Sequence, residues 1–368
     1  MGEQQRGKRR GGRHEDARAF AAAGRQVEAA QIWEALGAAA QARGDRAEAA
    51  QCWALAGDAL RRDERPAAAA AALGRALEVW AEPSPDVFGQ LPQGRVEQGA
   101  AKAILAGVLL DLGRIDEAAT LAGAVAEAAS SPGLRVLGLD LLSGAELARG
   151  AVERSRAAAA RMAEGCPEGA RPALWFREGV LWRMDGGLAR ARGCLHRVLE
   201  AAPAGPAWAG PRASAVAELA ELDLLDGNFT ASAEGFREAW GLWGEAGRAS
   251  GQWRAAAGRA LAQRGAGLLP NPDALDAGRS LAEERGLPLL SARMLATQGA
   301  LRAARGEPAA AELDRAVAVA AACGATLLEG WARWIRRTAG IDAGDQARME
   351  ACFAEDAVMG PRVARLRG

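Results

Sequence analysis

The stretch that decides the fold is WFREGVLWRMDGGLARARGCLHRVLEAAP, residues 175–203. Two helical runs are separated by Asp185-Gly186-Gly187, and the second run stops at Pro203. Glycine at such a turn reaches positive φ without a Cβ clash, so one helix can end there and an antiparallel helix can begin. Gly179 and Ala191 are small enough to let the two helices approach closely. The stretch therefore predicts a helix hairpin.

The same turn recurs along the chain. After a first, wider interval, successive turns lie roughly 36–41 residues apart, which is the period of a two-helix repeat. Alanine, the best helix former, dominates the runs between the turns, and the chain has no tyrosine. We therefore expect an all-α chain of roughly 16–18 helices, since a two-helix repeat of this period fills its length. The glycines that mark the turns are Gly44, Gly113, Gly150, Gly186, Gly227, Gly265 and Gly306.

This pattern resembles the tetratricopeptide repeat (TPR), and its longer pitch is similar to the helical repeats of large bacterial regulators. The resemblance implies a right-handed superhelical solenoid of antiparallel helix pairs, in which each pair buries its apolar face against its neighbours. In the stretch quoted above, the matching residues are Trp175, Gly179, Trp182, Gly186, Ala191, Leu199 and Pro203. A copy near the N-terminus has Trp33, Leu36, Gly37, Gly44, Ala49, Trp53 and Ala56 in the same phase.

Changes in composition along the chain predict five segments. Residues 1–13, with Lys8-Arg9-Arg10, read as a disordered basic tail. The others are N-terminal helical repeats over 14–81, a proline-rich loop or seam over 82–94, a TPR-like array over 95–325, and C-terminal capping helices over 326–368. The phase of the repeat near Gly265 stays open, because a longer loop through Pro270 and Pro272 replaces a turn there.

Composition argues against several classes of function. The formal net charge is zero, whereas a nucleic-acid binder normally needs a basic face. No apolar run is long enough to span a membrane or serve as a signal peptide, so we expect a cytoplasmic protein. Five scattered cysteines and two histidines give no metal-binding spacing. We expect no metal and no cofactor.

The sequence also lacks a convincing catalytic motif. Gly2-x-x-x-x-Gly7-Lys8 has the spacing of a phosphate loop, but Arg9 replaces the required Ser or Thr and no strand precedes it. Cys194 and His196 are close in sequence, yet on a helix their side chains point apart. We therefore expect a protein that is not an enzyme. A site built from carboxylates of several repeats stays open as an alternative.

In TPR proteins the first helix of each pair lines a concave face, and the resemblance implies a partner site there. Because the implied residues are mostly small or apolar, we expect a protein or peptide partner, such as an amphipathic helix, in a groove with sparse charge. TPR proteins that clamp a partner's C-terminal carboxylate use Lys and Asn on this face, which this chain lacks. The implied residues are Leu110, Leu137, Phe176, Val180, Arg183, Ala217, Glu221 and Leu224.

Three functional alternatives remain at this point. The leading hypothesis is a non-catalytic interaction scaffold or adaptor. The second is a regulatory or sensor subunit that controls a separately encoded effector, such as a kinase, protease or transcription factor. The third is an enzyme whose site is built across several repeats. A groove filled by the chain itself also stays open, and a homo-oligomer is compatible with the first two hypotheses because the end of a solenoid exposes apolar surface.

Overall fold

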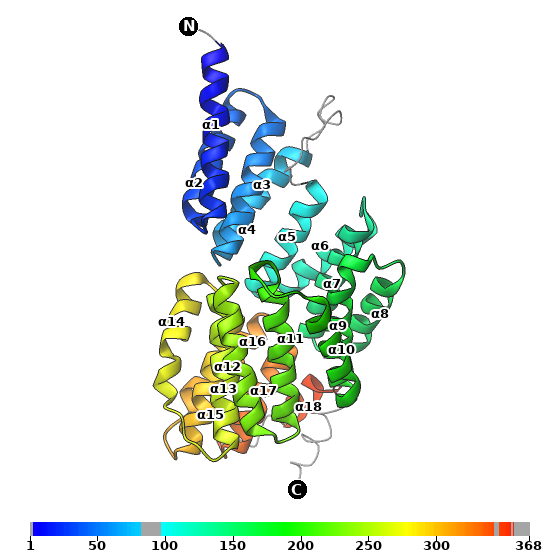
Figure 1. The fold of residues 1–368 in the computed structure, drawn as a ribbon. Coiled ribbons are helices and arrows are strands. Elements are labelled where there is room, and N and C mark those ends of the chain that lie inside the picture. The colour runs from blue at the N-terminus through cyan, green and yellow to red at the C-terminus, as the bar shows by residue number, and fades with distance from the viewer. Residues whose placement is uncertain (1–2, 82–96, 342–345, 355, 357–368) are drawn as a thin grey trace. The chain divides into compact units, whose positions relative to one another are not determined.

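The computed structural model describes residues 3–81, 97–341, 346–354 and 356, which form eighteen α-helices and two short 3-10 helices and no strand (Figure 1). Most helices are joined by tight turns to the next, so that consecutive helices pack as antiparallel pairs. The predictions of an all-α solenoid and of 16–18 helices are confirmed. The chain divides into two compact units, residues 1–109 and 110–368.

Unit 1 contains four helices packed in series, each against the next. Trp33 and Trp53 are buried in it, as expected for residues at core positions of the repeat. Most of a fifth helix, α5 (Gln98–Asp111), also belongs to this unit. The four helices are α1 (Glu3–Ala22), α2 (Gln26–Ala42), α3 (Arg46–Arg62) and α4 (Pro66–Ala81).

The prediction of a disordered tail over 1–13 needs correction. Residues 3–13 are the first part of α1, whose later part is anchored at Ala17, a fully buried residue. Once a docked segment has nucleated a helix, each added residue contributes a hydrogen bond at little cost, so the helix extends into a polar sequence. The seam predicted over 82–94 lies outside the described residues.

Unit 2 is built from two kinds of helix. Odd-numbered helices contact the odd-numbered helices on either side of them, whereas even-numbered helices pack mainly on their sequence neighbours. The odd set therefore forms an inner layer and the even set an outer layer. The inner helices are α7 (Pro132–Ala148), α9 (Arg171–Met184), α11 (Pro206–Leu225), α13 (Ala249–Gly265), α15 (Pro288–Ala304) and α17 (Thr326–Thr338). The others are α6 (Ile115–Glu127), α8 (Val152–Ala163), α10 (Leu188–Ala201), α12 (Phe229–Glu245), α14 (Asp276–Arg285), α16 (Ala310–Ala322) and α18 (Gln346–Cys352).

The inner helices of unit 2 form a closed ring. Contacts run from α7 through α9, α11, α13 and α15 to α17, and α17 in turn contacts α7. One apolar cluster joins the two ends of the array, with Ile115 and Ala145 from the first repeat packed among Ala292, Ala320 and Ala325 from the last. We call these six helices the inner ring.

The closed ring changes the interpretation of the C-terminal segment. Residues 326–368 were predicted to cap an open end, but α17 is a member of the inner ring. The apolar face that a solenoid end would expose is instead covered by the other end of the same array. The parts of this segment at 342–345, 355 and 357–368 lie outside the described residues.

The turn glycines occupy the positions that the sequence predicts, with one exception. Gly44, Gly113, Gly150, Gly186, Gly227 and Gly306 all have positive φ, which a residue with a Cβ rarely adopts. Gly265 instead lies at the end of α13, where an added Cβ would be 2.3 Å from the Phe229 ring. The positive-φ residue of that turn is Gly267. This corrects the marker of the degenerate repeat.

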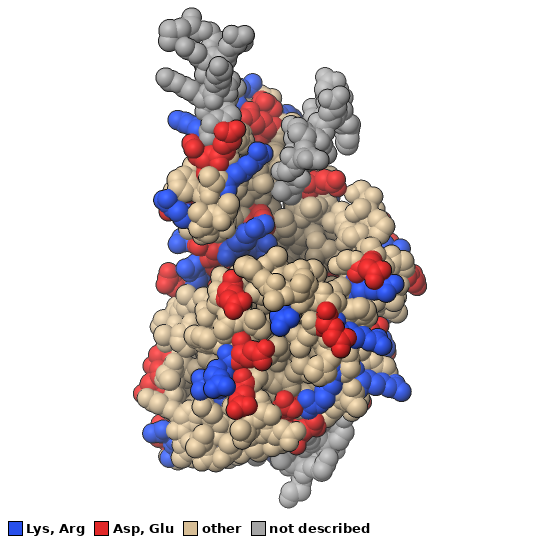
Figure 2. All heavy atoms as spheres, in the orientation of Figure 1, with Lys and Arg blue, Asp and Glu red and all other residues tan. Residues whose placement is uncertain are grey.

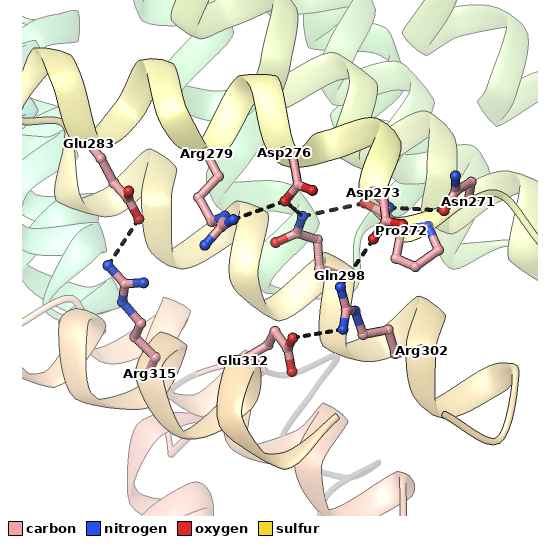
Figure 3. A network of polar contacts seen from close by, with 10 residues as sticks. All are labelled: Asn271, Pro272, Asp273, Asp276, Arg279, Glu283, Gln298, Arg302, Glu312 and Arg315. Carbon is pink, nitrogen blue, oxygen red and sulfur yellow. Dashed lines mark hydrogen bonds and ion pairs between the residues drawn. The ribbon is translucent and has the colours of Figure 1, made fainter. Parts of the chain in front are cut away.

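A polar network holds the irregular loop that follows Gly267 (Figure 3). Gln298 of α15 is buried and donates from Nε2 to the Pro272 carbonyl at 3.3 Å and to the Asp276 carboxylate at 2.9 Å. Arg302, one turn later, pairs with Asp273 at 3.1 Å. The loop has no regular helix to pair its polar groups, and these contacts with α15 pair them instead. The loop and α14 therefore stay docked on α15.

Glycines inside the helices let neighbouring helices approach closely. A Cβ at Gly179 would lie 3.0 Å from Leu195 Cγ and 3.3 Å from the Ala191 carbonyl oxygen, as the small residues of the hairpin predict. The constraint is stricter at Gly138 of α7, where the added Cβ would lie 2.8 Å from the backbone nitrogen of Ala126. Backbone atoms of a packed helix cannot move aside as a flexible side chain can.

Gly138→Ala is therefore expected to destabilise the protein by about 1–3 kcal/mol through overpacking, despite the better helix propensity of alanine. Gly123→Ala on the adjacent helix α6 is the matched control, because an added Cβ there meets nothing within 4 Å. The control is expected to stabilise by about 0.5–1 kcal/mol. Urea unfolding followed by circular dichroism measures both changes, and equal effects of the two substitutions would contradict the close-approach argument.

Candidate binding site on the inner helices

The inner ring carries charged side chains that pair from helix to helix. Arg177 of α9 contacts Asp140 of α7, with 2.9 Å between Nη2 and Oδ1. Arg183, also on α9, contacts Glu218 of α11, with 3.1 Å between Nε and Oε2. All four side chains are at least partly shielded from solvent. These pairs link α7 to α9 and α9 to α11 by charged side chains.

A further pair reaches past an intervening helix. Arg293 of α15 lies 2.5 Å from Glu221 of α11, although α13 stands between these two helices in the ring. An ion pair of this kind forms only where the three helices curve around a common inner side. We call Arg183, Glu218, Glu221, Arg254 and Arg293 the inner cluster.

Arg254 of α13 completes the inner cluster but is bonded differently. Its side chain is exposed, and it makes no hydrogen bond or ion pair with any residue that the structure describes. It nevertheless lies within the electrostatic influence of Glu218, Glu221 and Arg293. The cluster thus contains three guanidinium groups and two glutamates, and one guanidinium lacks a direct partner.

The surroundings of Arg183 and of Arg254 shift the pKa values of these two arginines in opposite directions. Desolvation works against the charged form of Arg183, but Glu218, Glu221 and Asp356 outweigh it, so the pKa of Arg183 is raised. Desolvation together with the nearby charge of Arg293 lowers the pKa of Arg254 below its ordinary value, although Glu218, Glu221 and Asp111 oppose that shift. Arg254 is therefore the member of the cluster whose charge is least compensated.

The structure brings together only part of the partner site implied by the sequence. Arg183 and Glu221 both belong to the inner cluster, and Leu137 is an exposed side chain three residues from Asp140 on α7. Val180 is buried. The remaining implied residues pack against core clusters and are only partly accessible: Leu110, Phe176, Ala217 and Leu224.

The inner face is also more charged than the sequence predicts. The prediction of sparse charge rests on a phase transferred from the first helix of each pair, and it omits Arg177, Glu218, Arg254 and Arg293. The signal that could have found them is spacing: Glu218 and Glu221 stand one helical turn apart, so they share a face of α11. The arginines give no such signal, because arginine is common on every face of these helices.

A second charged group helps to hold the end of the ring. Glu329 of α17 is buried, and its two carboxylate oxygens accept hydrogen bonds from Arg333 at 2.9 Å and from Arg348 of α18 at 2.7 Å. Burial by itself would raise the pKa of Glu329, but the two guanidinium groups outweigh it and hold the pKa below its usual range. The carboxylate thus stays charged and ties α18 to α17.

This pKa shift makes a pH-dependent contribution to stability. Because the folded-state pKa of Glu329 is lowered, the contribution is fully present above the unfolded pKa, about 4.3, and is lost as pH falls through the folded pKa. Glu329→Gln is expected to cost about 1–3 kcal/mol at pH 7 and progressively less below pH about 4. Parallel urea titrations of both proteins from pH 7 to pH 3 measure the difference, and a constant difference over that range would contradict the assignment.

Four cysteines in the described part of the chain have shifted pKa values. Burial raises the pKa of Cys52, Cys166, Cys194 and Cys323, which is opposite to the shift that activates a thiolate nucleophile. Among the described residues no group of three or more His, Cys, Asp or Glu could hold a metal ion, and no helix is long and apolar enough to cross a membrane.

The surface outside the ring shows mixed charge. Acidic and basic side chains are interspersed on the face seen in Figure 2, without a broad area of one sign. A surface hollow beside α12 and α13 is lined by Phe229 and Leu268 and bordered by Arg237 and Arg259. The residues that line this hollow come from α12, α13 and the turn that follows α13.

Comparison with known proteins gives a likeness at the level of fold. No protein-family model matches the sequence, and no curated protein matches it. Among solved structures, the chain is similar to the Rap conjugation gene regulator of the plasmid pLS20 in complex with the Phr* peptide. The TM-score is 0.56 at 8% identity, and the match covers 80% of this chain and 75% of that one.

Two TPR structures match with lower scores. A tetratricopeptide repeat protein from Parabacteroides merdae gives a TM-score of 0.38 at 16% identity, covering 83% of this chain and 98% of that one. The TPR domain of P58(IPK) gives 0.28 at 12% identity, covering 96% and 97%. The antiparallel helix pairs of this chain, joined at glycines with positive φ, are themselves TPR-like.

Proposed function

We propose that this protein is a non-catalytic interaction protein whose unit 2 binds a short, extended peptide segment against the inner side of the ring. The observation that carries the proposal is the inner cluster, in which charged side chains from α9, α11, α13 and α15 converge on one side of the ring. Such a face offers polar partners to a peptide backbone and its charged groups. It suits an extended segment better than the apolar face of an amphipathic helix.

The regulatory form of this function has its own support. The Rap regulator, similar in fold, is a conjugation gene regulator in complex with a peptide. A closed ring also couples its members, because a change at one helix contact must be accommodated around the circle. We therefore favour a peptide-responsive regulator or adaptor, placed in the cytoplasm, that acts on a separately encoded partner without a cofactor or catalysis.

The test uses the full-length chain and synthetic pools of random hexapeptides, each pool with one defined residue at one position. A pool that binds the folded state raises the melting temperature, and a ligand at 100 times its Kd adds about 2.7 kcal/mol to the free energy of unfolding. We expect at least one family of pools to do so. Uniformly unchanged melting temperatures would refute peptide binding.

Two leucine variants locate the binding surface. Leu137 lies on an inner helix and is 43% exposed, whereas Leu268 lies in the loop after α13 and is 58% exposed. Because both side chains are exposed, their replacement by arginine should leave the fold intact. We expect Leu137→Arg to weaken binding of the active pool at least fivefold and Leu268→Arg to leave it unchanged. The reverse result would move the site to the outer surface.

A further inference from the structure

Three sides of α13 can be assigned from its contacts. An added Cβ at Gly251 would meet Trp243 and one at Gly258 would meet Phe236, so these positions face α12. Ala257 and Ala260 pack with Leu290 and Met294 of α15, so they face the next inner helix. Arg254 lies between these two faces, on the side where α11 and α15 exchange the Glu221–Arg293 pair. This side is the inner side of the ring.

Arg259 provides a comparison on the same helix. It lies five residues after Arg254, which at about 100° per residue places it about 140° around the helix. There it borders the surface hollow on the outside, next to Arg237. Both arginines are exposed and neither has an ion-pair partner among the described residues, but Arg254 also experiences the charge of Arg293, Glu218 and Glu221.

The charges around Arg254 limit the kind of group that fits it. A planar guanidinium with free N–H donors binds carboxylate or phosphate oxygens in pairs. Glu218, Glu221 and Asp111 also act on this position, and their negative charge disfavours a doubly charged phosphate. Arg293 has a further buried donor, Nε, without a hydrogen-bond partner. A singly charged carboxylate is repelled less by these acids than a doubly charged phosphate is, so it is the anion that fits this position better.

We propose that Arg254, supported by Arg293, is the recognition site for a carboxylate of the bound peptide. This inference rests on the proposed function, because the carboxylate arrives on the peptide that the inner ring binds. The carboxylate belongs either to an Asp or Glu side chain or to the C-terminus of the peptide. In both cases the guanidinium of Arg254 donates two hydrogen bonds to it.

The experiment measures affinity of the most stabilising hexapeptide sequence for three full-length proteins: the wild type, Arg254→Gln and Arg259→Gln. The peptide is made in three forms, with all carboxylates free, with an amidated C-terminus, and with Asp and Glu replaced by Asn and Gln. A charge-assisted hydrogen-bond pair corresponds to a loss of about 10- to 100-fold in affinity when it is removed. Circular dichroism checks that each variant keeps its helical content.

We expect Arg254→Gln to lose at least tenfold for the all-acid peptide, with Arg259→Gln unchanged. For one of the two neutralised peptides, the wild type and Arg254→Gln should bind equally, which identifies the source of the carboxylate. If Arg254→Gln binds the all-acid peptide as tightly as the wild type does, the carboxylate site is refuted while peptide binding stands. If no peptide stabilises the wild type, the proposed function fails and this inference fails with it.

An independent measurement separates recognition from a structural role. An arginine that holds helices together would destabilise the free protein when replaced. Because Arg254 lies near Arg293 without a partner, Arg254→Gln should leave the free protein equally stable or more stable. A clear fall in the melting temperature of the free variant would assign Arg254 to the fold instead of the ligand.

Discussion

The apolar contact between the first and last repeats of unit 2 is the constraint on which the rest of its structure depends. Ile115 and Ala145 pack with Ala292, Ala320 and Ala325 in a single cluster, although more than a hundred residues separate the two groups in the sequence. An open solenoid leaves apolar surface at each end, and this cluster removes both ends together. The inner helices consequently have one common inner side in place of a long, shallow groove.

Closure explains why the inner face is charged. Charged side chains from α9, α11, α13 and α15 lie on the same side of the ring. Charges that would be far apart on a flat surface therefore come close enough to form ion pairs. Arg183 with Glu218 and Arg293 with Glu221 satisfy most of the charge that the inner helices bring together. The exception is Arg254, which has no direct partner among the described residues and a pKa that desolvation lowers. Shifted pKa values of this kind are common at functional sites. Closure of the ring thus places the residue on which the proposed function depends.

The candidate site was only partly predictable. Arg183 and Glu221 follow from the phase of the repeats, because each helix must place one face inward. Phe176 and Leu224 follow the same phase but pack into core clusters, since apolar side chains on a closing curve are drawn into the contacts between helices. Arg254 lies before the irregular loop at Pro270 and Pro272, and Arg293 lies after it. The repeat phase of the sequence is lost at this loop, which separates the two residues.

The sequence by itself determined the helices, their pairing and most of the turns. Those features depend on local physics: alanine favours the helix, and glycine permits the positive φ at Gly113 or Gly186 that a hairpin needs. Only the tertiary structure decided that the array closes and that Glu221 meets Arg293. Each repeat adds a small rotation and shift, and the sum of these changes over six inner helices fixes whether the ends meet. No local pattern in the sequence encodes that sum.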